Sequence, residues 1–252
     1  MGYCSVMSRL VEKAKRVAHM SLERAGMALF PKWYNKRFCA AEGMWDGYFS
    51  MAEPGMAGSW DRIIWPIIKD FDFDTVLELA PGAGRNTQKL MQVARVIHAV
   101  DMNEYALRKL RARFQTATRR CELHIHQNQG SDLAMIPDSS VTFIYSWDSA
   151  VHFDKAVLKE YLKEFFRVLR PNGAGFIHHS DLGAGAHVDI RKNPHWRSNM
   201  SKELFADYCQ RHGLEIIEQI GLPWPPIVDC ISVFRKSTAR IRHLGSGIQR
   251  KW

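Results

Sequence analysis

The sequence is poor in cysteine and has no long apolar run, and both absences limit what the protein can be. Its five cysteines are odd in number, lie far apart and form no C-x-x-C pair, so neither a disulfide framework nor a zinc site is expected. No apolar segment approaches the ~20 residues that a membrane span needs, and the N-terminus lacks the apolar core of a secretory signal. We therefore expect a cytoplasmic protein with free thiols. Of its 252 residues, 46% are hydrophobic and 24% charged, which is typical of a globular protein with one sizeable domain.

The net charge of +9 is concentrated at the two ends of the chain. Residues 1–37 contain eight Lys or Arg and two Asp or Glu, and residues 235–252 contain six basic residues and no acidic one. The stretch between them is mildly acidic. Two interpretations stay open: the basic tails are simply solvated, or they contact an anionic surface such as lipid headgroups, a phosphorylated glycan or nucleic acid.

An amphipathic helix is expected near the N-terminus. From Met7 to Met27, apolar residues recur at three- and four-residue steps opposite a basic face. This helix would pack on the body of the protein, on a second copy in a homo-oligomer, or on the inner membrane surface as a peripheral contact.

The rest of the chain predicts an α/β fold. We expect a helical N-terminal extension and cover over residues 1–57, the main domain over 58–236, and a basic C-terminal tail over 237–252. In the main domain apolar strands alternate with amphipathic helices, which predicts a doubly wound, mostly parallel sheet. The expected strands are Thr75–Ala80, Arg95–Asp101, Cys121–Gln127, Val141–Ser146 and Gly173–His179. Leu214–Ile220 and Val228–Phe234 are expected to form an antiparallel hairpin at the sheet edge.

A glycine turn follows the first of these strands. Gly82 and Gly84 would let the backbone turn tightly and approach a ligand. A dinucleotide-binding turn would have a third glycine where this chain has Thr87. Glu78, just before the turn, would repel a pyrophosphate but suits a cationic ligand. Asp101, which ends the second strand, could accept hydrogen bonds from both hydroxyls of a ribose.

An acid on strand one followed by G-x-G resembles the first motif of class I methyltransferases. The resemblance covers roughly residues 60–180. It implies a Rossmann-like fold and S-adenosyl-L-methionine as cofactor. It also implies that Asp132 holds the adenine amino group, that Met102 and Leu133 flank the ring, and that the end of strand four holds the methionine part. The cofactor residues expected in this way are Glu78, Ala80, Gly82, Gly84, Asp101, Met102, Asp132, Leu133, Ser146 and Trp147.

The acceptor side is expected beyond strand four. His152 follows Asp148 by four residues and is a candidate general base, because the imidazole pKa of ~6.5 suits removal of a hydroxyl proton. It could instead pack or cap the next helix. Asp148, or His179 at the end of strand five, would orient the base. Neighbouring residues on a strand face opposite sides, so at most one of His178 and His179 is expected to face the acceptor. Asp148 and Asp181 could hold magnesium, but no compact metal motif is present, and we assign no metal ligand.

A loop before the last helix completes the expected acceptor site. His195, Trp196 and Arg197 combine an aromatic ring with polar donors, which suits binding of a sugar, and Trp45 belongs to an aromatic cover expected to contact the acceptor. With the Met-Ser helix start and Asp229–Cys230, this segment resembles bacterial methyltransferases of polysaccharide and glycan pathways. The resemblance implies an O-methyltransferase that acts on a sugar hydroxyl of a glycan, oligosaccharide or glycolipid precursor.

Two alternatives stay open. A nucleic-acid or small-molecule methyltransferase would share the cofactor half, but no Asn-Pro-Pro-Tyr run is present, and the basic residues lie in the tails rather than around the expected site. We therefore do not expect nucleic acid as a partner. A non-catalytic binding subunit of the same fold is the other alternative, although the intact first motif, Asp101 and His152 argue against it.

Overall fold

The computed structural model describes residues 53–115, 120–183, 197–224 and 227–237. The amphipathic helix expected over 7–27, the aromatic cover up to residue 52 and the tail from residue 238 lie outside the described residues. In the part of the chain that the structure describes, no helix is long and apolar enough to cross a membrane.

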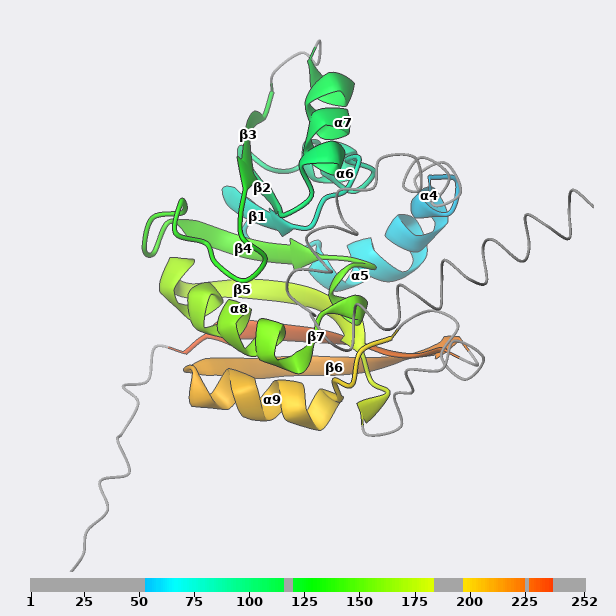
Figure 1. Ribbon diagram of the computed structural model, residues 1–252, viewed down its shortest axis with the longest axis vertical. Helices are drawn as coiled ribbons and strands as arrows, with labels where there is room; N and C mark the ends of the chain where they lie inside the picture. The colour runs from blue at the N-terminus through cyan, green and yellow to red at the C-terminus, as the bar shows by residue number, and fades with distance from the viewer. Residues whose placement is uncertain (1–52, 116–119, 184–196, 225–226, 238–252) are drawn as a thin grey trace, which may run out of the picture.

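The described residues form a seven-stranded sheet in the order β3-β2-β1-β4-β5-β7-β6 (Figure 1). Its strands are β1 (Thr75–Leu79), β2 (Val96–Asp101), β3 (Glu122–Gln127), β4 (Val141–Ser146), β5 (Leu169–Ser180), β6 (Leu214–Trp224) and β7 (Ile227–Lys236). The first five strands are parallel, whereas β7 runs antiparallel to both β5 and β6. This confirms the expected fold class, with the antiparallel pair at the C-terminal edge.

Helices cover both faces of the sheet. On one face lie α4 (Met56–Ser59), the π-helical turn η1 (Trp60–Ile64), α5 (Trp65–Ile68), α6 (Thr87–Leu90) and α7 (Glu104–Phe114). The other face carries α8 (Lys155–Val168) and α9 (Lys202–Arg211), and a 3-10 turn, η2 (Ala150–His152), precedes α8. Apolar side chains from the two faces of β1 and β4 enter two separate core clusters, as a doubly wound sheet requires.

Local sequence signals explain where the helices begin. Asn103 accepts hydrogen bonds from the backbone N–H groups of Tyr105 and Ala106 and caps α7. Ser201 caps α9, as its sequence position indicates, by accepting from the backbone N–H of Leu204 at 3.2 Å. The helix between β1 and β2 is short, because α6 has only one turn before the chain turns into β2. Because β1, β2 and β4 are parallel, the turns that follow them lie together along the edge of the sheet formed by the carboxyl ends of the strands.

Candidate functional site

The turn between β1 and α6 is held in left-handed conformations. Ala80, Gly82 and Gly84 have φ angles of +55°, +56° and +89°. A Cβ atom on Gly84 would come within 2.5 Å of Leu110 Cδ1 and 2.7 Å of Phe114 Cε2, so glycine is required for the turn to lie this close to α7. The turn is therefore fixed at the carboxyl end of β1, the edge at which open α/β sheets bind ligands.

A buried carboxylate lies just before this turn. Glu78 is 1% exposed, and its Oε2 accepts a hydrogen bond from the Thr87 hydroxyl at 2.6 Å. Burial raises the pKa of Glu78 to about 8; the Thr87 hydrogen bond opposes this shift, and the negative charge of Asp101 adds to it. No basic side chain among the described residues contributes to the shift, so a cationic ligand would stabilise the ionised form.

A second buried carboxylate ends β2. Asp101 accepts hydrogen bonds from the backbone N–H groups of Asn103 at 2.9 Å and Gly82 at 3.4 Å. Burial raises the pKa of Asp101 to about 6, against the lowering effect of these backbone bonds. Two acidic side chains thus lie on either side of one glycine turn.

The loop after β3 lies beside the end of β2. Met102 approaches Gly130, where a Cβ atom would be 3.4 Å from the Met102 sulfur. Asp132 Oδ2 accepts a hydrogen bond from the backbone N–H of Gln129 at 2.9 Å, so this carboxylate caps its own loop. Leu133 is fully buried in the core cluster beneath α8. The structure therefore places Asp132 and Met102 near the second strand end, while the Leu133 side chain lies in the core.

Several buried polar atoms near the end of β4 have no hydrogen-bond partner within the described residues. They are Tyr145 Oη and Ser146 Oγ on β4 and Asn86 Oδ1 at the start of α6. Each of these residues is at least nine-tenths buried. Unsatisfied buried polar groups are costly and uncommon, so a bound group that supplies partners would stabilise this edge.

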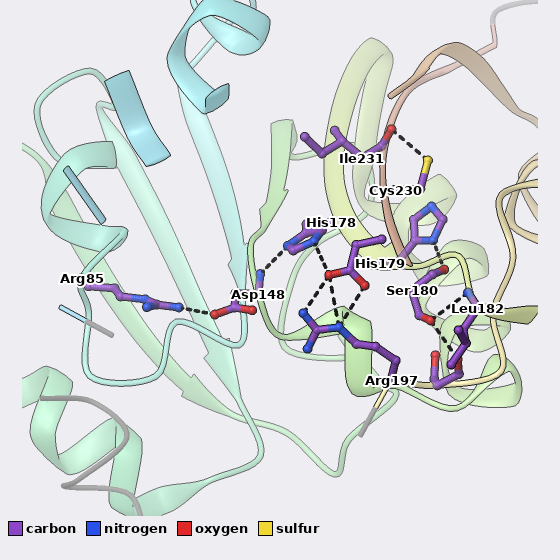
Figure 2. Close-up of polar contacts among 11 residues, drawn as sticks. Arg85, Asp148, His178, His179, Ser180, Leu182, Arg197, Cys230 and Ile231 are labelled. Atoms are coloured by element: carbon purple, nitrogen blue, oxygen red, sulfur yellow. Dashed lines mark hydrogen bonds and ion pairs between the residues drawn. The ribbon is translucent and has the colours of Figure 1, made fainter. Parts of the chain in front are cut away.

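A chain of polar contacts continues from the glycine turn across the sheet edge (Figure 2). Arg85 Nη2 pairs with Asp148 Oδ2 at 2.9 Å, and the backbone N–H of Asp148 donates to His178 Nδ1 at 3.2 Å. His178 Nε2 lies 3.2 Å from Asp229 Oδ2, and Arg197 donates to both oxygens of Asp229 at 2.7–3.1 Å. These five residues are called the edge network below. Burial alone would raise the pKa of Asp229, but hydrogen bonds from His178 and Arg197 hold it below its ordinary value.

The comparisons with known proteins agree with this geometry. Residues 76–173, which run from β1 into β5, match the family model described as "Methyltransferase domain". This segment of the chain is therefore similar to a methyltransferase domain. No curated protein matches the sequence.

Solved methyltransferases share the fold. A S-adenosylmethionine-dependent methyltransferase from Methanosarcina mazei superposes with a TM-score of 0.56 at 16% identity, covering 68% of this chain and 97% of that one. A candidate methyltransferase of the same class from Listeria monocytogenes gives a TM-score of 0.56 at 15% identity, covering 72% and 99%. A candidate sarcosine dimethylglycine methyltransferase from Galdieria sulphuraria gives 0.55 at 16% identity, covering 74% and 86%. At these identities the likeness shows the fold alone.

The methyltransferase family implies S-adenosylmethionine, and the residues around the turn fit this cofactor. Glu78 and Asp101 supply negative charge and acceptors for a ligand that carries an ammonium, a sulfonium and a ribose. The unpartnered oxygens of Tyr145 and Ser146 belong to the last two residues of β4, which pairs with β1, and that of Asn86 lies at the start of α6. The buried acids and the buried polar atoms are thus complementary to the cofactor.

His179 occupies a different position from the one expected for a residue that orients the base. It is fully buried, its Nε2 lies 2.7 Å from the Ser232 hydroxyl, and its ring stacks on Phe205 of α9 at 4.3 Å. Burial lowers the pKa of His179 to about 4. Because side chains alternate along β5, it is His178 that reaches the edge network, where its ring packs against Trp147 at 4.4 Å.

The other residues expected on the acceptor side lie in different settings. Asp148 and His152 both follow β4; the Asp148 side chain is 30% exposed, and His152 is exposed at the end of η2. Arg197, expected to place the acceptor, is instead only 9% exposed and is engaged by Asp229. Trp45, His195 and Trp196 lie outside the described residues.

The magnesium option finds no support in the part of the chain that the structure covers. No group of three or more His, Cys, Asp or Glu side chains there is arranged to hold a metal ion. Asp181, expected near Asp148, accepts a hydrogen bond from the backbone N–H of Lys202 at 2.7 Å and supports the start of α9.

Three residues of the edge network were absent from the expected site: Arg85, His178 and Asp229. The alternation of side chains along β5 already implied that only one of two adjacent histidines faces the edge, but it does not say which. Asp229 belongs to a strand 51 residues away from His178 in sequence. No local pattern links them, so this contact could not be found from the sequence alone.

Proposed function

We propose that the chain transfers a methyl group from S-adenosylmethionine to a hydroxyl of a sugar-containing acceptor, such as a glycan, oligosaccharide or glycolipid precursor. The observation that carries the methyl-transfer part is the pair of buried acids, Glu78 and Asp101, on either side of one glycine turn. When bound, the cofactor supplies an electrophilic methyl group on a positively charged sulfur.

Each group of residues has a separate task in this proposal. Glu78 provides negative charge beside the cation, and Asp101 accepts hydrogen bonds from the ribose. His152 accepts the proton of the acceptor hydroxyl as the oxygen–carbon bond forms and the carbon–sulfur bond breaks, leaving a methyl ether and S-adenosylhomocysteine. Support for this role is its exposure at the end of η2, four residues after Asp148.

A transfer assay with labelled cofactor tests the proposal. The parent protein is offered a panel of sugars, glycolipids and RNA, with and without magnesium. We expect transfer to a sugar hydroxyl and a decrease in kcat of ~10²–10⁴-fold in His152→Ala, the usual contribution of general acid–base catalysis. His124→Ala, which changes a histidine on β3, is the matched control.

The outcomes separate the alternatives. Transfer to RNA alone would identify a nucleic-acid methyltransferase. Binding of S-adenosylhomocysteine without transfer to any acceptor in the panel would favour a non-catalytic subunit. An unchanged kcat for His152→Ala on a sugar acceptor would remove His152 from the mechanism.

The basic N-terminal stretch is a separate part of the proposal. Lys and Arg residues between Met7 and Met27 would dock on anionic lipid, each contributing ~1 kcal/mol near the surface. Vesicle co-sedimentation at low and high salt tests this, with a chain that starts at Trp33 as the control. Equal partition of the two chains would contradict it.

A further inference from the structure

The backbone at Asp148 has an unusual conformation that its surroundings must maintain. Asp148 has a φ of +59°, and Ala80, at the end of the neighbouring strand, has a φ of +55°. For residues with a Cβ atom this region is unfavourable, because the Cβ atom comes too close to the following carbonyl oxygen. The Ser149 hydroxyl donates to the Ala80 carbonyl at 3.1 Å and joins the two strand exits. Left-handed residues in fixed surroundings are common at functional sites.

Hydrogen bonds to both ring nitrogens hold His178 in one tautomer and one ring orientation. Its Nδ1 accepts the backbone N–H of Asp148, so its proton is on Nε2, which donates to Asp229. A proton on Nδ1 would face the Asp148 N–H directly. With both nitrogens engaged and 1% of its side chain exposed, His178 has no nitrogen available to take a proton from a substrate.

Asp229 anchors this arrangement. It is fully buried, and it accepts from the Arg197 guanidinium through both oxygens while it holds His178 Nε2. A carboxylate engaged on both sides fixes the ring plane of His178, as a carboxylate partner commonly does for a functional imidazole. Trp147 limits tilting of that ring from its face.

We infer that His178 is a positioning residue that holds Asp148 in its left-handed conformation. This inference rests on the proposed function. The His178 ring fixes the Asp148 N–H, and the resulting backbone turn aims the Asp148 carboxylate at Arg85 of the cofactor turn. The same turn leads into η2, where the Val151 carbonyl accepts from the backbone N–H of Ser198, next to Arg197. His178 therefore sets the position of Asp148 and His152 relative to the methyl donor.

Two variants separate the two halves of this contact. H178N keeps an acceptor near the place of Nδ1 and loses the donor to Asp229, whereas H178Q keeps a donor near the place of Nε2 and loses the acceptor for Asp148. We expect the Asp148 amide hydrogen to exchange at least tenfold faster in H178Q than in H178N. On the acceptor identified by the transfer assay, kcat should be about tenfold lower in H178Q than in H178N, with the same KM for the cofactor in both variants.

A purely structural role for His178 makes a different prediction: both variants would lose Tm and activity together. Equal exchange rates at Asp148 in the two variants, or faster exchange in H178N, would overturn the inference. If a variant does not fold, the ¹⁵N chemical shifts of the His178 ring in the parent protein show which nitrogen carries the proton. A proton on Nδ1 would also overturn the inference. Failure of the parent to bind S-adenosylhomocysteine would refute the proposed function and leave the exchange result interpretable.

Discussion

Replacing Glu78 by Gln should stabilise the protein without cofactor and weaken cofactor binding. The amide has almost the same shape as the carboxylate. Its oxygen can still accept the hydrogen bond from the Thr87 hydroxyl, which lies 2.6 Å from Glu78 Oε2 in the parent protein. What the variant removes is an acid that is 1% exposed and that no basic side chain of the described residues stabilises. The Gln side chain cannot ionise, so it cannot supply the negative charge that a cationic ligand would stabilise on Glu78.

The size of the effect follows from the pKa of Glu78. Its value of about 8 in the folded protein exceeds the ordinary 4.5, so the folded state binds more protons than the unfolded state between these pH values. The contribution of Glu78 to stability is therefore fully present below pH 4.5 and is lost as pH rises to 8. At 1.36 kcal/mol per pKa unit the loss is roughly 5 kcal/mol at most. The Tm advantage of Glu78→Gln should thus grow with pH, to on the order of 10 °C near pH 8.

Calorimetry checks both halves of this prediction. Thermal scans from pH 5 to 8.5 compare the Tm of parent and variant, so that pH effects of all other groups cancel. Titration with S-adenosylmethionine near pH 7, in two buffers of different ionisation enthalpy, should show proton release by the parent, because the bound cation lowers the pKa of Glu78. Glu78→Gln should bind more weakly and release no proton at this site. A variant less stable than the parent at pH 8, or proton uptake by the parent, would show that the pKa of Glu78 is not raised in the protein without cofactor.

Other changes test the neighbouring features. Asp101→Ala should weaken S-adenosylhomocysteine binding several-fold or more in calorimetry, since up to two ribose hydrogen bonds to a charged acceptor are lost, each ~1.5–3 kcal/mol at most; unchanged affinity would remove Asp101 from the site. Gly84→Ala should lower Tm, because its Cβ would collide with α7 at 2.5 Å and its φ is +89°; a parent-like Tm would contradict the packing. Burial, then nearby His126 and His124, lower the pKa of His98 to about 4, so stability should be lost as pH falls from 6.5 to 4, and His98→Gln should flatten that slope in acid unfolding.

The conformation of the glycine turn could be predicted because its signals are local. Glu78, Gly82 and Gly84 lie within a few residues of one another, and the period of the flanking strand places them at its carboxyl end. Asp101 likewise follows from the end of the next strand. A short stretch of chain therefore determines both the conformation and the chemistry of this part of the site.

The acceptor side was harder to predict because its contacts are non-local. The sequence favours Arg197 as a ligand for the acceptor, since it lies in a polar loop beside an aromatic residue. In the folded protein Arg197 forms an ion pair with Asp229, which lies 32 residues away in the sequence. Similarly, the sequence does not indicate which of His178 and His179 faces the edge network. In the structure His179 stacks on Phe205 of α9, whereas His178 packs against Trp147.

The antiparallel direction of β7 explains how the edge network can exist. Asp229 is the third residue of β7 and pairs in register with Ser180, the last residue of β5. Because β7 runs opposite to β5, its beginning meets the carboxyl ends of the parallel strands. A seventh strand parallel to the others would place its early residues at the opposite edge, more than 20 Å away for strands of this length, at ~3.3 Å per residue. Inserting β7 between β5 and β6 thus brings a fully buried carboxylate to the edge where the glycine turn lies, and through His178 it acts on the backbone that carries Asp148.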